Sequence, residues 1–393
     1  MSVVAGSPTT SEEEAMMLAV VRELVAKKVA PRAAQIDESA EFPYDLKALF
    51  AENDLLGIPI PAEYGGLGGS FVTYVKVVEE IAKACASSSL IVAVQELGML
   101  PILIGGSEEQ KRQYLPKLAS GQWIAAYALT EASSGSDAAG SMRTKAVRRG
   151  DTYILDGQKI WITHGSVADV ICVFAVTDPS KGAAGISAFI VEKDFKGFHV
   201  GKKERKMGIR GSPTVELTFD GCEVPAANRI GEEGVGFKIA MKVLDKSRPG
   251  IAAQALGIAA GALEYATNYA KERIAFGRPI GQHQGVGFML ADMQTEVEAA
   301  RLLLYEAARK CDEGAADVSL WAAMAKLKCG DVAMAVTTDA VQVLGGFGYS
   351  AEYPVERMMR DAKITQIYEG TQQIQRLVIA RALVGKGNPS APR

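Results

Sequence analysis

The feature that most constrains the fold is a change in the spacing of apolar residues along the chain. Residues from about 11 to 120 show the spacing of amphipathic helices. Between about 122 and 229, apolar residues instead form short β-branched or aromatic runs separated by turn residues, at 170–176, 186–191 and 215–219. The helical spacing then returns and persists to about residue 384. This order predicts a mostly α protein with a central antiparallel β domain.

The same change of spacing predicts the domain boundaries. We expect an N-terminal helical domain at 1–120, a middle β domain at 121–232, a C-terminal helical bundle at 233–385 and a flexible tail at 386–393. The tail is expected because its sequence is polar and rich in Pro and Gly. Long helical patterns predict the helices of the bundle at 237–271, 284–311, 318–343 and 371–384.

Two local motifs add detail to this plan. Ser11 with the three glutamates after it resembles a capping box and predicts the start of the first helix. In the middle domain, the runs 152–155 and 159–163 flank Asp156-Gly157, a dipeptide typical of tight turns, and predict a β-hairpin.

Composition excludes several functional classes. The 393 residues carry a net charge of −3 without a basic cluster, which predicts no nucleic-acid partner and no anionic membrane surface. No apolar run approaches the length of a membrane span, and the N-terminus lacks the pattern of a signal or transit peptide, so we expect a cytoplasmic protein. The five cysteines and three histidines show no metal-ligand spacing. Neither a Rossmann glycine fingerprint nor a Gly-x-Ser-x-Gly elbow is present, which argues against a nicotinamide-dependent enzyme and a serine hydrolase.

One carboxylate near the C-terminal end is a candidate general base. Glu369 lies between Tyr368 and Gly370, and a glycine leaves room for another molecule to approach the backbone. The residues after it predict a helix with one buried face, formed by Ile374, Leu377, Val378 and Ala382. By residue type alone, Glu369 has a second interpretation as a solvated cap in the first turn of that helix, stabilised by the helix dipole.

The sequence IYEGTQQIQR at 367–376 resembles the C-terminal signature of the acyl-CoA dehydrogenase family. Further segments resemble the family's pattern in the same order, so that the likeness spans nearly the whole chain: 127–137, 160–163, 271–284 and 342–348. The resemblance implies an acyl-CoA dehydrogenase-like fold with an N-terminal helical domain, a middle domain like a β-barrel and a C-terminal four-helix bundle. It also implies an FAD-dependent enzyme.

The resemblance implies two groups of flavin contacts. In the family, the loop at 127–137 lines the flavin, Trp161 forms a wall against the isoalloxazine ring, and Thr163 bonds near its N5. The segments 271–284 and 342–348 contact the ADP half of FAD across a subunit boundary. The residues implied to bind FAD are Tyr127, Leu129, Thr130, Ser136, Trp161, Thr163, Arg273, Phe276, His283, Gln284, Gln342, Gly345, Gly346, Thr371 and Gln373.

One position departs from the family's pattern. Ile274 and Ala275 stand where many relatives carry a polar residue just before the phenylalanine, here Phe276. One hydrogen bond to FAD at that position is therefore not expected, whereas the guanidinium of Arg273 still suits a pyrophosphate.

The resemblance also implies the substrate contacts and the reaction. The residues implied to bind the acyl thioester are Ser136, Asp245, Arg248, Tyr368, Gly370 and Arg381. Glu369 is implied to remove the α-proton while the β-hydride passes to flavin N5, which yields a trans-2-enoyl thioester. Its backbone N–H and a ribityl hydroxyl of FAD are the expected donors to the enolate oxygen. We expect burial to raise the pKa of Glu369, opposed in part by the helix N-terminus.

A minority of the family places its base on the substrate helix instead. The matching position here is Ser247, which cannot act as a base. Glu369 is therefore left as the expected base.

The implied partners are an acyl-CoA or acyl-carrier-protein thioester, an electron-transfer flavoprotein and further copies of the chain in a homotetramer, a dimer of dimers. Small residues in the helix at 318–343 suit a subunit interface, and they suit the core of a monomer equally well. We expect short or medium acyl chains, branched chains included, in a pocket shaped by 94–98 and 250–254. The alternatives are an oxidase or flavin monooxygenase of the same fold, a biosynthetic dehydrogenase that uses acyl carrier protein, and a non-catalytic flavoprotein scaffold.

Overall fold

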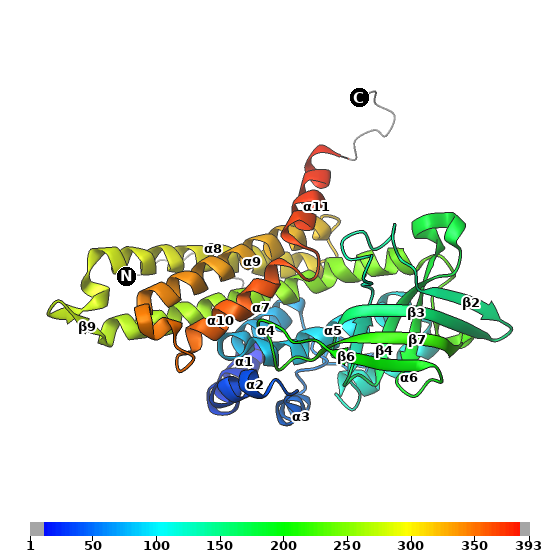
Figure 1. The fold of residues 1–393 in the computed structure, drawn as a ribbon, viewed down its shortest axis with the longest axis horizontal. Coiled ribbons are helices and arrows are strands. Elements are labelled where there is room, and N and C mark those ends of the chain that lie inside the picture. The colour runs from blue at the N-terminus through cyan, green and yellow to red at the C-terminus, as the bar shows by residue number, and fades with distance from the viewer. Residues whose placement is uncertain (1–11, 386–393) are drawn as a thin grey trace.

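The computed structural model describes residues 12–385, with a helical bundle at one end and a β-sheet at the other (Figure 1). The helices of the N-terminal block are α1 (Glu12–Leu24), α2 (Ala33–Ser39), α3 (Tyr44–Glu52), α4 (Phe71–Ala84), α5 (Ala86–Gly105) and α6 (Glu108–Ala119). The expected cap at Ser11 and the expected tail at 386–393 lie outside the described residues.

Helix α5 corrects the expectation that no apolar run approaches the length of a membrane span. It has 20 residues, and its most apolar window of 18 residues has a mean hydropathy of 1.7, so it is long and apolar enough to cross a membrane. However, 78% of its most apolar window is buried inside the fold, as in a core helix. Gly98 allows this packing, because a Cβ there would lie 2.5 Å from the Cβ of Ala125.

The middle block contains one sheet of eight strands in the order β6-β7-β3-β2-β4-β5-β8, with β1 paired to β4. The strands are β1 (Ala125–Ala128), β2 (Lys145–Arg149), β3 (Thr152–Thr163), β4 (Val170–Val176), β5 (Ile186–Glu192), β6 (Phe198–Lys203), β7 (Thr214–Pro225) and β8 (Arg229–Ile230). Most pairs are antiparallel, as expected. Two parallel pairs, β1 with β4 and β2 with β4, were not indicated by the sequence.

The predicted hairpin around Asp156-Gly157 is wrong. Strand β3 runs through this dipeptide and pairs with β2 on one side and β7 on the other. The register against β7 shifts between Leu155 and Gly157. Gly157 has a φ of +149°, and a Cβ there would lie 2.6 Å from the Cα of Thr144. The Asp-Gly dipeptide therefore marks an irregularity within one strand.

The helices of the C-terminal block are α7 (Gly236–Glu272), α8 (Gln284–Asp312), α9 (Val318–Leu344), α10 (Pro354–Ala362) and α11 (Gln372–Val384). The helices expected at 237–271, 284–311, 318–343 and 371–384 agree with α7, α8, α9 and α11 to within one residue at each end. Helix α4 packs closely against α7. A Cβ at Gly257 or Gly261 would lie 2.4 or 2.2 Å from the backbone oxygens of Glu79 and Lys83.

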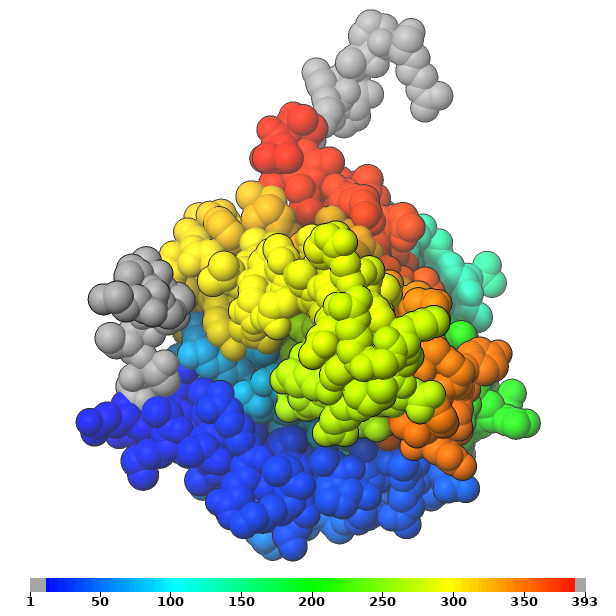
Figure 2. Space-filling model, turned by 90° about the vertical axis from the view of Figure 1, so that its left-hand side faces the viewer, coloured from blue at the N-terminus to red at the C-terminus, as the bar shows by residue number. Residues whose placement is uncertain are grey.

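The connection between α7 and α8 forms the end of the bundle that is remote from the sheet. Its short strands β9 (Ile274–Ala275) and β10 (Arg278–Pro279) pair with each other. They lie at the left in Figure 1 and face the viewer in Figure 2. Helix α11, in contrast, projects from the bundle on the side of the sheet (Figure 1).

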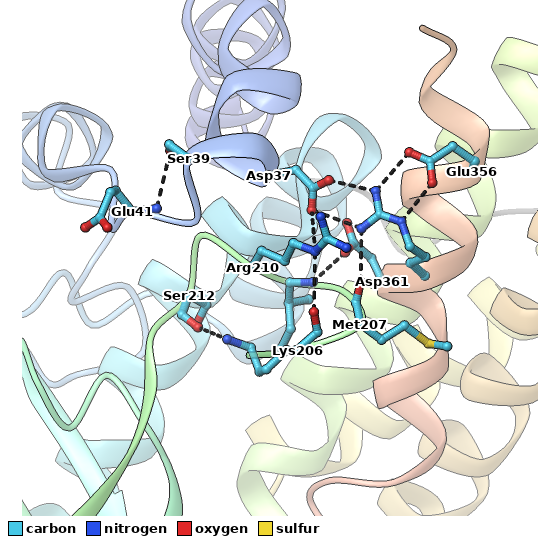
Figure 3. A network of polar contacts seen from close by, with 11 residues as sticks. Asp37, Ser39, Glu41, Lys206, Met207, Arg210, Ser212, Glu356 and Asp361 are labelled. Atoms are coloured by element: carbon cyan, nitrogen blue, oxygen red, sulfur yellow. Dashed lines mark hydrogen bonds and ion pairs between the residues drawn. The ribbon is translucent and has the colours of Figure 1, made fainter. Parts of the chain in front are cut away.

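A polar network joins the three blocks just before the segment that carries Glu369 (Figure 3). The guanidinium of Arg360 on α10 donates two hydrogen bonds to Asp37 on α2, at 3.1 and 2.7 Å. The next residue, Asp361, accepts a hydrogen bond from the backbone N–H of Ile209 in the loop between β6 and β7. Burial raises the pKa of Asp361 to about 6. The end of α10 is therefore fixed to both other blocks.

Candidate active site

A cavity of about 830 Å³ lies where the three blocks meet. The N-terminal block contributes α5, and the middle block contributes the loop after β1 and the end of β3. The C-terminal block contributes α7, the turn before α11, and α11 itself. Each block thus supplies part of the wall, which is typical of ligand sites at domain junctions.

Glu369 lies on the wall of this cavity in a backbone conformation that glutamate rarely adopts. Its φ is +56°, and that of Gly370 is +88°. The chain therefore turns sharply before α11, and Glu369 precedes that helix, as the predicted helix at 371–384 implies, so the alternative interpretation as a cap in its first turn is wrong. Thr371 is the N-cap instead, and its Oγ1 accepts a hydrogen bond from the N–H of Ile374 at 3.3 Å.

The carboxyl group of Glu369 has a raised pKa. Burial raises this pKa, whereas a hydrogen bond from Ser247 and the positive charges of Arg248 and Lys326 oppose the rise. The Ser247 hydroxyl donates to Oε2 of Glu369 at 2.8 Å. We expected a helix N-terminus to oppose the rise in this pKa, but Ser247, Arg248 and Lys326 oppose it instead. A partly buried carboxyl with a raised pKa, open to a cavity, suits a general base.

Tyr368 is held from the opposite side of the same turn. Its hydroxyl donates to Oε1 of Gln254 on α7, and Nε2 of Gln254 donates to the backbone oxygen of Ala86 at 2.9 Å. Burial raises the pKa of Tyr368, and the charge of Glu369 adds to the rise. Tyr368 is therefore a neutral, fixed neighbour of the carboxylate.

A buried ion pair positions the loop after β1. Lys159 on β3 has no exposed surface, and its Nζ lies 2.7 Å from Oε1 of Glu131. It also donates to the backbone oxygen of Leu129 at 3.1 Å. Glu131 accepts further hydrogen bonds from the N–H groups of Arg143 and Thr144, at 2.6 and 3.0 Å. Burial lowers the pKa of Lys159 to about 8, although Glu131 opposes this shift. The pair therefore ties the loop to β3.

An aromatic surface forms the wall contributed by β3. Trp161 has a φ of +60° and is 56% exposed, although it lies at the end of a strand beside buried residues. It lines the cavity together with Thr163. An exposed indole on a cavity wall offers a flat apolar face to a planar ligand.

The structure places about half of the predicted site residues on the cavity wall. These are Tyr127, Leu129, Thr130, Ser136, Trp161, Thr163, Arg248, Tyr368, Glu369, Gly370 and Arg381. Asp245 lies just behind the wall and accepts a hydrogen bond from Arg248 at 2.8 Å. Thr371 caps α11, and Gln373 is exposed.

The other predicted FAD contacts gather at the far end of the bundle. The guanidinium of Arg273 lies 5.3 Å from the centre of the Phe347 ring, which brings the α7–α8 connection beside the turn after α9. Phe276 is 95% exposed. The predicted contacts outside the cavity of this chain are Arg273, Phe276, His283, Gln284, Gln342, Gly345 and Gly346.

Two residues of the site, Gln375 and Lys326, were missed in the sequence, and a third, Gln254, was expected only as the end of a segment that shapes the pocket. Gln254 fixes Tyr368, as described above, and Gln375 donates to the backbone oxygen of Glu369 at 3.1 Å. Lys326 on α9 donates to the backbone oxygen of Gly370 at 2.6 Å. A signal for Lys326 was present, because it shares a helical row with Cys329 and Ala333, both of which are buried.

Models of three domains match the chain in sequence. They are described as the N-terminal, middle and C-terminal domains of acyl-CoA dehydrogenase, and they match residues 11–122, 126–222 and 234–384. The chain belongs to the acyl-CoA dehydrogenase family.

Individual relatives agree with this assignment. An acyl-CoA dehydrogenase of Bacillus subtilis is 51% identical over 376 residues, which is 95% of this chain and 99% of the relative. Butyryl-CoA dehydrogenase from Megasphaera elsdenii has a similar structure, with a TM-score of 0.94 and 45% identity over 96% of this chain and all of that one. A chain solved in work on the electron transferring flavoprotein of Acidaminococcus fermentans has a TM-score of 0.95 and 48% identity, covering 97% of this chain and all of that one.

The acyl-CoA dehydrogenase is a flavin-dependent oxidoreductase, and its cavity fits FAD. The hydroxyl of Tyr127 and Nε of Arg248 are buried and have no hydrogen-bond partner within the described residues, although both residues line the cavity. Buried polar groups normally have partners, so these atoms suit a polar ligand. The exposed face of Trp161 suits the flat ring of a flavin.

We predict that Lys159→Met weakens FAD binding and destabilises the enzyme. The substitution leaves Glu131 buried without its cation, and breaking a buried pair in this way costs about 3–5 kcal/mol. The loop after β1 then loses its attachment to β3. Flavin content after gel filtration and the midpoint of thermal unfolding measure both effects. Lys145→Met, on the exposed face of β2, is the control and should change neither. Normal flavin content in Lys159→Met would contradict the prediction.

Proposed function

We propose that this acyl-CoA dehydrogenase oxidises short- or medium-chain acyl-CoA thioesters, branched chains included, to trans-2-enoyl-CoA, with Glu369 as the base. The observation that carries the proposal is the position of one carboxylate with a raised pKa on the wall of a cavity that Trp161 and Thr163 also line. A base must approach the α-carbon on one face while the hydride acceptor lies on the other. A cavity lined both by Glu369 and by the flavin wall, which is the surface formed by Trp161 and Thr163, suits that arrangement.

The residues of this chain perform the proton transfer. Glu369 takes the α-proton, and Ser247 keeps its carboxylate oriented by a hydrogen bond of 2.8 Å. The backbone N–H of Glu369 makes no hydrogen bond within the described residues, so it remains available to the thioester oxygen as negative charge develops there. Bound FAD supplies the acceptor for the β-hydride.

The walls of the cavity favour a short apolar acyl group. Val94 and Leu97 on α5 and Ile251 on α7 line it, and they fall within the segments 94–98 and 250–254 expected to shape the pocket. The cavity of about 830 Å³ must hold the flavin ring as well as the thioester. The likeness to a butyryl-CoA dehydrogenase supports the same size class.

We assign the cluster at the far end of the bundle to FAD bound in the cavity of a second copy. Arg273, Phe276 and Phe347 lie together on that end, and Phe276 is almost fully exposed in the isolated chain. This assignment requires at least a dimer, and a dimer of dimers remains our expectation for the complete assembly.

The remaining partners follow from the same reaction. A reduced flavin must pass its electrons on, and the likeness to a chain from work on an electron transferring flavoprotein supports such an acceptor. CoA is the proposed carrier because the relatives named above are acyl-CoA enzymes. We further propose that the enzyme works in the cytoplasm.

We predict that Glu369→Gln lowers the rate of flavin reduction by more than about 100-fold, the usual share of a general base. The rate is measured by the loss of flavin absorbance on mixing with acyl-CoA. Because Glu369 must be ionised to accept the proton, kcat/KM of the wild type should fall as the pH falls through the raised pKa of this group. Glu352→Gln, an exposed glutamate outside the cavity, is the control. Retention of more than about a hundredth of the rate would exclude Glu369 as the base.

Substrate and acceptor are separated by a panel of thioesters. We expect flavin bleaching to be fastest with straight or branched acyl-CoA of about four to eight carbons, because the apolar part of the cavity is small. We also expect slow reoxidation of the reduced enzyme in air-saturated buffer. Rapid reoxidation would favour an oxidase, and preference for an acyl-carrier-protein thioester would favour a biosynthetic enzyme. No bleaching by any thioester would favour a scaffold.

We predict that Arg273→Ala weakens FAD binding about tenfold or more, although Arg273 is remote from the cavity of its own chain. A hydrogen bond to a charged group contributes about 1.5–3 kcal/mol, which is consistent with this loss. Equilibrium dialysis of FAD against the apoprotein measures it. Lys271→Ala, an exposed residue two positions earlier, is the matched control. Wild-type affinity in Arg273→Ala would remove the support for a shared flavin site.

A further inference from the structure

The buried face of α9 carries a charged side chain directly beneath the turn that holds Glu369. Lys326 is 1% exposed, and the other buried residues of α9 are uncharged. Its Nζ donates to the backbone oxygen of Gly370 at 2.6 Å and to Oε1 of Gln372 at 3.3 Å. Burying an ammonium group is costly unless its hydrogen bonds are satisfied, so this placement calls for an explanation.

The turn has few other means of keeping its conformation. Glu369 has a φ of +56°, which a glutamate does not adopt without support from its surroundings. Gln375 donates to the backbone oxygens of Glu369 and Gly370, at 3.1 and 2.9 Å. The carbonyl group of Gly370 therefore accepts from Gln375 and from Lys326. These two donors fix the orientation of the backbone next to Glu369.

The start of α11 and the middle of α9 are joined as one unit. Nε2 of Gln372 donates to the backbone oxygen of Leu327 at 2.8 Å and to Oδ1 of Asp331 at 3.0 Å. Gly330 allows this approach, since a Cβ there would lie 3.0 Å from Nε2 of Gln372. The position of Lys326 relative to the turn is thus set by the packing of two helices.

The ammonium group of Lys326 also acts on the carboxylate at a distance. The charged groups that influence it are Glu369 in the turn, Arg248 on α7 and Asp331 on α9 itself. Burial lowers the pKa of Lys326 to about 8, so the side chain is mainly charged at neutral pH. Its charge in turn opposes the rise in the pKa of Glu369. An opposite charge stabilises the ionised form of a base even where the two groups share no hydrogen bond.

We propose that Lys326 is a positioning residue, which fixes the turn through the carbonyl group of Gly370 and stabilises the ionised form of Glu369 through its ammonium charge. The proposal rests on the proposed role of Glu369 as the base. Lys326 does not line the cavity, and the proposal gives this buried cation a function in proton transfer.

The test compares Lys326→Gln, Lys326→Met and Lys328→Met in the FAD-loaded enzyme. Gln retains an N–H donor for Gly370 without the charge, and Met removes both. Lys328 lies on the same helix with its Nζ paired to Glu296, and its side chain is 38% exposed, so it controls for loss of a lysine from α9. Flavin content and the thermal unfolding midpoint identify variants that are folded.

The informative measurement is equilibrium deprotonation of a 3-thia-acyl-CoA. Sulfur in place of the β-carbon leaves an acidic α-proton but no β-hydride to transfer. The resulting enolate beside the flavin absorbs at long wavelength, and its absorbance is followed across pH. A role limited to folding would not move the midpoint of this titration.

We expect the midpoint of Lys326→Gln to rise by about one unit or more, which is about tenfold less enolate at a pH below the midpoint. Lys326→Met, where folded, should rise at least as far, and Lys328→Met should match the wild type. An unchanged midpoint in Lys326→Gln would overturn the proposed role of the charge. If Lys326→Met does not fold, the result for Lys326→Gln alone decides whether the charge has this role. If the wild type does not deprotonate the analogue at all, the proposed role of Glu369 fails instead.

Discussion

A glutamate with a φ of +56° costs the folded chain on the order of 1 kcal/mol or more relative to ordinary backbone, so the turn at Glu369 persists only because its neighbours hold it. Three helices supply that support. Gln254 on α7 accepts a hydrogen bond from Tyr368, and Lys326 on α9 donates one to Gly370. Gln375 on α11 donates to the carbonyl groups of Glu369 and Gly370. Strain of this kind recurs at functional sites, because it directs a side chain into a cavity that a regular helix would not reach.

On the wall that the middle block contributes, a buried lysine also holds a loop by bonding to a backbone oxygen. Lys159 is as deeply buried as Lys326, and it too holds a loop by a backbone oxygen, that of Leu129. For both lysines burial lowers the pKa to about 8. A buried ammonium group is stable only where its donors are used, so each lysine specifies one loop conformation more strictly than apolar packing does. The hydrogen bond from the N–H of Ile209 to Asp361 then joins the middle and C-terminal blocks, which carry these two walls (Figure 3).

The long helices could be predicted from sequence because their apolar residues follow one period over many turns, as in α7 and α8. Short-range signals were less reliable. Asp156-Gly157 is typical of a turn, yet β2 and β7 pair with the strand on both sides and keep it continuous through the dipeptide, a long-range effect that no dipeptide reveals. The helical row of Lys326 indicated a buried position, but its role could not be predicted, for a related reason. Its partner is the carbonyl group of Gly370, 44 residues away, and a backbone acceptor leaves no trace in residue type.

The predicted buried face of α11 shows what apolar spacing can and cannot establish. Ile374, Leu377 and Val378 do share one face, but Leu377 is 48% exposed, and the residues that α11 buries are Gln372 and Gln375. The expectation of a face packed in the core of this chain was therefore wrong, because the apolar residues line the cavity and the glutamines bond to backbone. Periodicity indicates that a face avoids water, whereas the covering group can be a ligand or another subunit as readily as the chain itself. An acyl thioester over α11 and a second copy over Phe276 would account for both exposed surfaces.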